Sequence, residues 1–176
     1  AGKRSRSPFG SFDAYEATAL KALGRPDEAA AVIEAAIRER PEDPDLLAVR
    51  ARDLLTAGQR DEAEAVLRRA VEVSPFHQTA RSQLGSLLEA DGRPDEAVEV
   101  FEELLRIQPD DAGALFSVGS IRLEADPEGA LPYLEEACRL SPGRQDYLRA
   151  LGAAYIRVGR LNEAEGTLRR AVEVDP

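Results

Sequence analysis

The chain has 176 residues, of which 43% are hydrophobic and 32% are charged, and its formal net charge is −10. This composition predicts a folded, soluble protein, and the negative charge disfavours nucleic acid as a partner because it repels phosphate backbones. No apolar run approaches the roughly 20 residues needed to cross a bilayer, so we expect no membrane insertion.

Residues 1–9 carry Lys3, Arg4 and Arg6 and are predicted to form a basic, flexible N-terminal segment. Three charges are too few to indicate a nucleic-acid-binding arm. The single cysteine, Cys138, excludes an intramolecular disulfide and any CxxC site. This favours a cytoplasmic location and leaves a periplasmic one open.

One phrase then recurs along the chain. It reads GRPDEAAAVIEAAIRERP over 24–41, GQRDEAEAVLRRAVEVSP over 58–75, GRPDEAVEVFEELLRIQP over 92–109, DPEGALPYLEEACRLSP over 126–142 and GRLNEAEGTLRRAVEVDP over 159–176. The closing prolines are 34, 34, 33 and 34 residues apart, a period that indicates stacked structural repeats. A second helical segment precedes each phrase, for example 79–90 and 146–158, so each repeat is predicted to be a helix pair.

The ends of the predicted helices carry consistent signals. A glycine at 24, 58, 92 or 159 suits the left-handed residue that follows a helix C-terminus. Proline at 26 and 94 suits the first turn of the next helix, where the following Asp-Glu pairs complement the helix dipole. The closing proline ends each second helix, because it cannot continue the hydrogen-bonding pattern.

These residues resemble the tetratricopeptide repeat (TPR), in the tandem arrays typical of bacteria. The last repeat matches the family pattern at Leu148, Leu151, Gly152, Tyr155, Ala164, Leu168, Ala171 and Pro176. The resemblance implies an all-α fold, a right-handed α-solenoid (superhelix) of five helix-turn-helix units. The units would lie at 10–43, 44–77, 78–111, 112–144 and 145–176, forming one TPR domain over 10–176.

Two repeats depart from the pattern. The first has Asp13, Glu16 and Ala17 where the family places a large apolar residue, Leu and Gly. The fourth has Pro132 within its second helix, where a proline lacks the N–H and crowds the preceding turn. We therefore expect that helix to start late or to bend.

The sequence shows no catalytic motif. His77, the only histidine, has no second His or Cys at ligand spacing, and we interpret it as a surface or hinge residue. Cys138 is interpreted as a small packing residue, with Glu135 and Glu136 expected to raise its pKa. We predict that the chain is not an enzyme and uses no metal or cofactor.

The resemblance instead points to a groove lined by the first helix of each pair. Its predicted peptide-binding residues are Arg52, Thr79, Ser82, Ser86, Phe116, Ser120, Arg149, Ala153 and Arg157. Many neighbouring positions carry small side chains, which leaves room for another chain. Phe116 could anchor a partner or pack between repeats, and both interpretations stay open. The set lacks the Lys and Asn pattern of the TPR clamps that hold acidic chaperone tails.

The function predicted from these features is non-catalytic binding of a partner peptide or helix in the groove. The alternatives are a self-assembling structural scaffold and a recruiting or regulatory region of a larger enzyme. The last helix is expected to expose Leu161, Leu168, Ala171, Val172 and Val174, a face that further repeats or another copy could cover.

Overall fold

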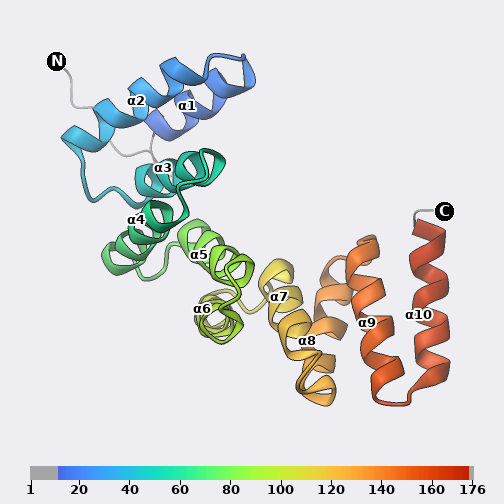
Figure 1. Ribbon diagram of the computed structural model, residues 1–176. Helices are drawn as coiled ribbons and strands as arrows, with labels where there is room; N and C mark the ends of the chain where they lie inside the picture. The colour runs from blue at the N-terminus through green and yellow to red at the C-terminus, as the bar shows by residue number, and fades with distance from the viewer. Residues whose placement is uncertain (1–11, 175–176) are drawn as a thin grey trace. The chain divides into compact units, whose positions relative to one another are not determined.

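The computed structural model describes residues 12–174, and these form ten α-helices and no strand (Figure 1). The helices are α1 (Phe12–Ala22), α2 (Pro26–Glu39), α3 (Pro44–Thr56), α4 (Arg60–Val73), α5 (Gln78–Ala90), α6 (Pro94–Ile107), α7 (Ala112–Arg122), α8 (Pro127–Leu140), α9 (Gln145–Arg157) and α10 (Leu161–Val174). The all-α prediction is confirmed. The basic segment 1–9 and Pro176 lie outside the described residues. The chain forms two compact units, 1–87 and 88–176, and α5 crosses the boundary between them.

Four of the turns inside the helix pairs share one geometry. Gly24, Gly58, Gly92 and Gly159 have φ of 73°, 78°, 72° and 79°, as their positions predicted. The residue after each glycine donates its backbone N–H to a carbonyl five residues back, for example Gln59 to Leu54 at 2.9 Å. This closure satisfies a carbonyl at the end of the first helix and reverses the chain into the second.

In the unit of residues 1–87, α1 packs against α2 and α3 packs against α4. Its core includes Ala17, Ala29, Ile33, Ala36 and Leu46, all buried. The alanines allow the helix axes to approach closely, and a larger side chain at such a contact would overpack it at a cost of about 1–3 kcal/mol.

The unusual first repeat uses an ion-pair network where the family pattern would place an apolar side chain. Asp13 of α1 is buried and pairs with Arg40, which also donates to Asp43 at 2.9 Å. Asp43 in turn caps α3 by accepting the backbone N–H of Asp45. A buried carboxylate is tolerated here because its charge is matched across the repeat boundary.

In the unit of residues 88–176, successive helices from α6 to α10 pack against one another. The buried core includes Leu115, Leu134, Leu148 and Ala154. Gly152 gives α9 close access to α10, since a Cβ at that position would lie 2.5 Å from Cδ2 of Leu168. Gly152 is one of the positions at which the last repeat matches the family pattern.

Of the two predicted responses to Pro132, a late start and a bend, helix α8 does not show the late start. It begins at Pro127 and runs through Leu140 with Pro132 inside it. Asp126 explains the early start, because its side chain accepts the N–H of Gly129 at 2.9 Å and Pro127 has the fixed φ that suits a first helical position.

The expected apolar face of α10 is only partly present. Leu161, Val172 and Val174 are exposed, but Ala171 is buried and Leu168 is half-buried against α9. Leu161 and Val172 lie at opposite ends of the helix, about 16 Å apart at 1.5 Å per residue. The fully exposed apolar side chains therefore lie near the two ends of α10.

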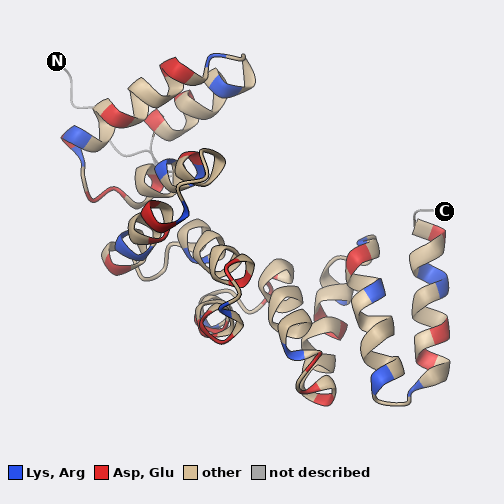
Figure 2. Cartoon of the chain, in the orientation of Figure 1, with Lys and Arg blue, Asp and Glu red and all other residues tan. Residues whose placement is uncertain are grey.

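Groups of acidic and basic residues alternate along α4 and α10 (Figure 2). Near the start of these helices a recurring ion pair links Arg25 to Glu28 at 2.6 Å and Arg93 to Glu96 at 2.7 Å. Such exposed pairs contribute little to stability, but they neutralise the arginines that make them.

Candidate protein-interaction site

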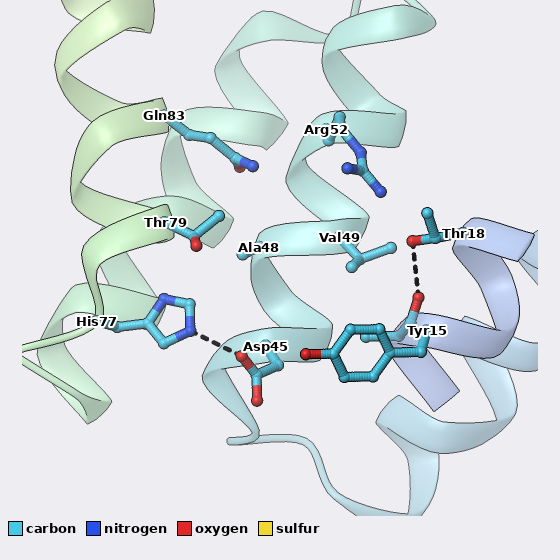
Figure 3. Close-up of a pocket in the computed structure, with 10 residues that line it drawn as sticks. Tyr15, Thr18, Asp45, Ala48, Val49, Arg52, His77, Thr79 and Gln83 are labelled. Atoms are coloured by element: carbon cyan, nitrogen blue, oxygen red, sulfur yellow. Dashed lines mark hydrogen bonds and ion pairs between the residues drawn. The ribbon is translucent and has the colours of Figure 1, made fainter. Parts of the chain in front are cut away.

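A pocket of about 170 Å³ lies in the unit of residues 1–87. It is formed by the first helices of three successive repeats, α1, α3 and α5, together with the residue before α5 (Figure 3). Its walls consist of Ala14, Tyr15, Thr18, Asp45, Ala48, Val49, Arg52, His77, Thr79 and Gln83. No second helix of a pair contributes to these walls, so the pocket belongs to the face on which the groove was predicted.

The helical period explains why these side chains meet. Ala14 and Thr18 on α1 are four residues apart, as are Ala48 and Arg52 on α3, so each pair lies on one face of its helix. The structure brings together Arg52 and Thr79, two of the predicted site residues. It adds Tyr15, His77 and Gln83, which the groove positions did not include.

His77 has a defined structural role at the mouth of this pocket. Its Nδ1 accepts the backbone N–H of Ala80 at 3.2 Å, which makes it the N-terminal cap of α5. Its Nε2 lies 3.0 Å from Oδ1 of Asp45 on α3 and, in the neutral tautomer, donates to it. The interpretation of His77 as a surface or hinge residue is therefore incomplete, because it joins two first helices.

Arg52 is exposed on α3 and directed into the hollow (Figure 3). Its guanidinium makes no hydrogen bond or ion pair with any residue that the structure describes. On the opposite side, Oε1 of Gln83 is buried and has no hydrogen-bond partner among the described residues. The pocket thus offers one positive charge that no described residue neutralises.

Ser82 and Ser86 continue along α5 without lining the pocket. Ser86 is exposed and Ser82 is half-buried. Both lie within the first compact unit, on the same helix as Thr79.

The remaining predicted residues lie in the unit of residues 88–176. Phe116 of α7 stacks on Tyr147 of α9, with ring centroids 4.4 Å apart and an interplanar angle of 16°. The guanidinium of Arg144 lies 4.6 Å from the centroid of Tyr147. Burial raises the pKa of the Tyr147 phenol. Phe116 therefore packs between repeats, while its half-buried ring keeps part of its surface accessible.

Two predicted arginines of this second unit differ in their surroundings. Arg157 donates to Glu124 at 2.5 Å, so its charge is matched. Arg149 is exposed and has no ion-pair partner among the described residues. Ala153 is half-buried on the same helix as both.

Ser120 departs from expectation. We expected its side chain to face solvent, but its hydroxyl oxygen is buried and has no hydrogen-bond partner within the described part of the chain. The 3.6-residue period placed Ser120 on the groove face, and the neighbouring side chains that enclose the hydroxyl are not visible to periodicity alone.

Cys138 is buried, and burial raises the pKa of its thiol to about 11. Nearby Asp146 raises it further and Arg170 lowers it. The adjacent glutamates named from the sequence are not among the causes, so that explanation was wrong although the direction was right. Such a thiol carries little thiolate at neutral pH and is a poor nucleophile.

Within residues 12–174, no cluster of His, Cys, Asp or Glu side chains could hold a metal ion. None of the helices described there is both long and apolar enough to span a membrane.

The comparisons with known proteins agree with the helix pairs. Three family models, each described as tetratricopeptide repeat, match residues 13–53, 48–112 and 122–176. A search of curated proteins finds no significant match.

Several solved structures share the fold. MamA (41-end) from Desulfovibrio magneticus RS-1 matches with a TM-score of 0.77 and 21% identity over 94% of this chain and 96% of that one. YrrB, described as a TPR protein with an unusual peptide-binding site, matches with a TM-score of 0.74 and 18% identity over 93% of this chain and 85% of that one. TTC0263, a thermophilic TPR protein of Thermus thermophilus, matches with a TM-score of 0.66 and 26% identity over 93% of this chain and 90% of that one. The family models cover most of the chain, and the ten described helices follow one another as the helix pairs of this repeat. The chain therefore belongs to the tetratricopeptide repeat family.

Proposed function

We propose that this protein is a non-catalytic interaction module that holds a peptide segment or helix of a partner protein against the first helices of its repeats. The observation that carries the proposal is the pocket of residues 1–87, because α1, α3 and α5 all contribute to it. A binding surface shared by successive repeats is the usual way in which stacked helix pairs present an extended site.

Family membership supports the broader part of this proposal. A role in protein interaction or scaffolding fits TPR proteins, and their repeats are typically non-catalytic. The peptide-binding site named for YrrB supports the more specific part, since the two chains share a fold.

The proposed contacts fall into two sets, one in each compact unit. Arg52, Thr79, Ser82 and Ser86 form the first set, around the pocket. The second set is Phe116, Arg149, Ala153 and Arg157, with Ser120 contributing no exposed hydroxyl. Because the pocket lies in the first unit, that unit is the better place to begin the test.

Selection from a displayed library of random peptides tests the proposal. Thr79→Trp places a large ring at an exposed position of the pocket wall. Ala65→Trp places the same ring on the exposed face of α4 and serves as the matched control. We expect the wild type and the Ala65→Trp variant to recover the same peptides, and the Thr79→Trp variant to lose them while keeping its helical circular dichroism. Equal recovery by all three proteins would refute binding at this face.

Two observations would distinguish the alternative functions, a self-assembling scaffold and a recruiting region of an enzyme. A self-assembling scaffold would show a mass that rises with concentration in light scattering. A recruiting region of an enzyme would be encoded in one reading frame with a catalytic domain. The apolar face of α10 that would support the first alternative is only partly exposed.

A further inference from the structure

We propose that the pocket of residues 1–87 selects its partner by one internal acidic side chain, whose carboxylate pairs with Arg52. This inference rests on the proposed function and adds the chemistry of the ligand to it. Two features of the pocket support it: its charge balance and its size.

The charge balance favours an anion at Arg52. The guanidinium of Arg52 has no partner among the described residues, whereas arginines at the starts of the second helices, such as Arg25 and Arg93, each pair with a glutamate. A guanidinium offers a planar set of donors that matches a carboxylate in two parallel hydrogen bonds. The two bonds would form without breaking an existing ion pair of Arg52.

The same balance disfavours an acidic run. Asp45 lies in the pocket wall, where its carboxylate accepts a hydrogen bond from His77. An acidic and a basic side chain, Asp45 and Arg52, therefore both line the hollow. A second or third acidic side chain of the ligand would meet Asp45 and a chain whose net charge is −10.

The size of the hollow limits how much can enter. About 170 Å³ is comparable to a cavity that accepts benzene, so it accommodates about one side chain. Ala48 and Val49 form an apolar wall beside the charged groups. The stem of an Asp or Glu would pack there while its carboxylate reached Arg52.

The experiment uses the full chain and a library of random peptides displayed between fixed flanking residues, so that no free C-terminus is presented. The selection compares the wild type with Arg52→Glu and Arg50→Gln, and a fourth protein, Arg52→Gln, is used in the binding measurement. Arg50 lies two residues from Arg52 on α3 but lines a different pocket with Glu34 and Asp53, so it is the matched control.

We expect the wild type and the Arg50→Gln variant to enrich Asp or Glu at one peptide position. The Arg52→Glu variant should enrich Lys or Arg there instead. A selected peptide, synthesised with an acetylated and an amidated end, should bind the wild type at least about tenfold more tightly than its Asp→Asn form, as expected for a hydrogen-bonded charge pair. In the Arg52→Gln variant, the two peptides should bind equally.

Selected peptides that need the pocket but show no acidic preference would overturn this inference and leave the proposed function intact. The same applies to binding that requires a free C-terminal carboxylate. Peptides whose recovery is unaffected by Thr79→Trp, or a library that yields none, would overturn both.

Discussion

His77 caps α5 and at the same time joins it to α3, because its Nδ1 accepts the N–H of Ala80 at 3.2 Å and its Nε2 lies 3.0 Å from Asp45. His77 and Asp45 are 32 positions apart in the chain, so the contact joins successive repeats. It also fixes one edge of the pocket, because both side chains line it.

Replacement of this histidine should therefore lower stability. We expect His77→Ala to lower the free energy of unfolding by about 1–2 kcal/mol, the usual cost of losing a helix cap and a hydrogen bond. His77→Asn should recover part of the loss, since Asn caps helices well but is too short to keep the contact with Asp45. Urea unfolding of the three proteins measures this. A His77→Ala midpoint equal to that of the wild type would show that the contact does not stabilise the fold.

Two helical glycines should respond oppositely to alanine. A Cβ at Gly119 would lie 2.7 Å from Cγ of Leu134 and 3.3 Å from the carbonyl oxygen of Ala130, whereas a Cβ at Gly166 would contact nothing within 4 Å. We expect Gly119→Ala to lower the free energy of unfolding by about 1–3 kcal/mol through overpacking. Gly166→Ala should raise it by about 0.5–1 kcal/mol, because alanine favours the helix. Stabilisation of both variants would contradict the claim that α7 and α8 approach too closely at Gly119 to admit a Cβ.

Pro132 should be a site of stabilisation. It lies inside α8 and its side chain is exposed, so alanine would restore a hydrogen bond to the carbonyl of Glu128 with little loss of packing. A proline inside a helix lowers the free energy of unfolding by about 3 kcal/mol, while its restriction of the unfolded chain raises it by about 1 kcal/mol. We therefore expect Pro132→Ala to raise the free energy of unfolding by about 2 kcal/mol.

Pro127→Ala is the control for that experiment, because Pro127 occupies the first position of α8, where no N–H bond is lost. Thermal unfolding followed by circular dichroism compares the two variants. A Pro132→Ala variant no more stable than Pro127→Ala would mean that α8 has already adapted to its proline.

The raised pKa of the buried Cys138 thiol predicts a loss of folding stability at high pH. Folding raises the pKa of its thiol to about 11, whereas the unfolded thiol ionises near 8.5. Since the folded pKa is the higher one, the thiol stabilises the fold fully below about 8.5 and progressively less as the pH rises towards 11. Urea unfolding at several pH values should show this extra decline in the wild type and not in Cys138→Ala. Identical pH profiles would contradict the burial of the thiol.

Much of the fold follows directly from the sequence. The 34-residue period, the four glycines after the first helices and the prolines at the helix ends predicted helix pairs that the structure contains, because each signal acts within one repeat. The start of α8 was mispredicted because the penalty of Pro132 was weighed without the capping bond of Asp126. The pairing of Asp13 with Arg40 spans two repeats and could not be found from either one alone.

The candidate site was less predictable. Helical spacing predicted that Arg52 and Thr79 share one face of the repeats, and both line the pocket. The roles of His77 and Gln83 depend on where α5 lies against α3, which no spacing within one helix reports. The stacking of Phe116 on Tyr147 was one of two interpretations and needed the distance between α7 and α9 to be known.

The most direct test of the account is to map a bound peptide onto the protein by NMR. A peptide selected by the wild-type chain is titrated into the isotope-labelled protein, and changes in backbone amide shifts are assigned to residues. The account predicts that the largest changes occur on the first helices, at Ala14, Ala48, Arg52, Thr79 and Gln83. Changes confined to the second helices α2 and α4, with these amides unmoved, would contradict it.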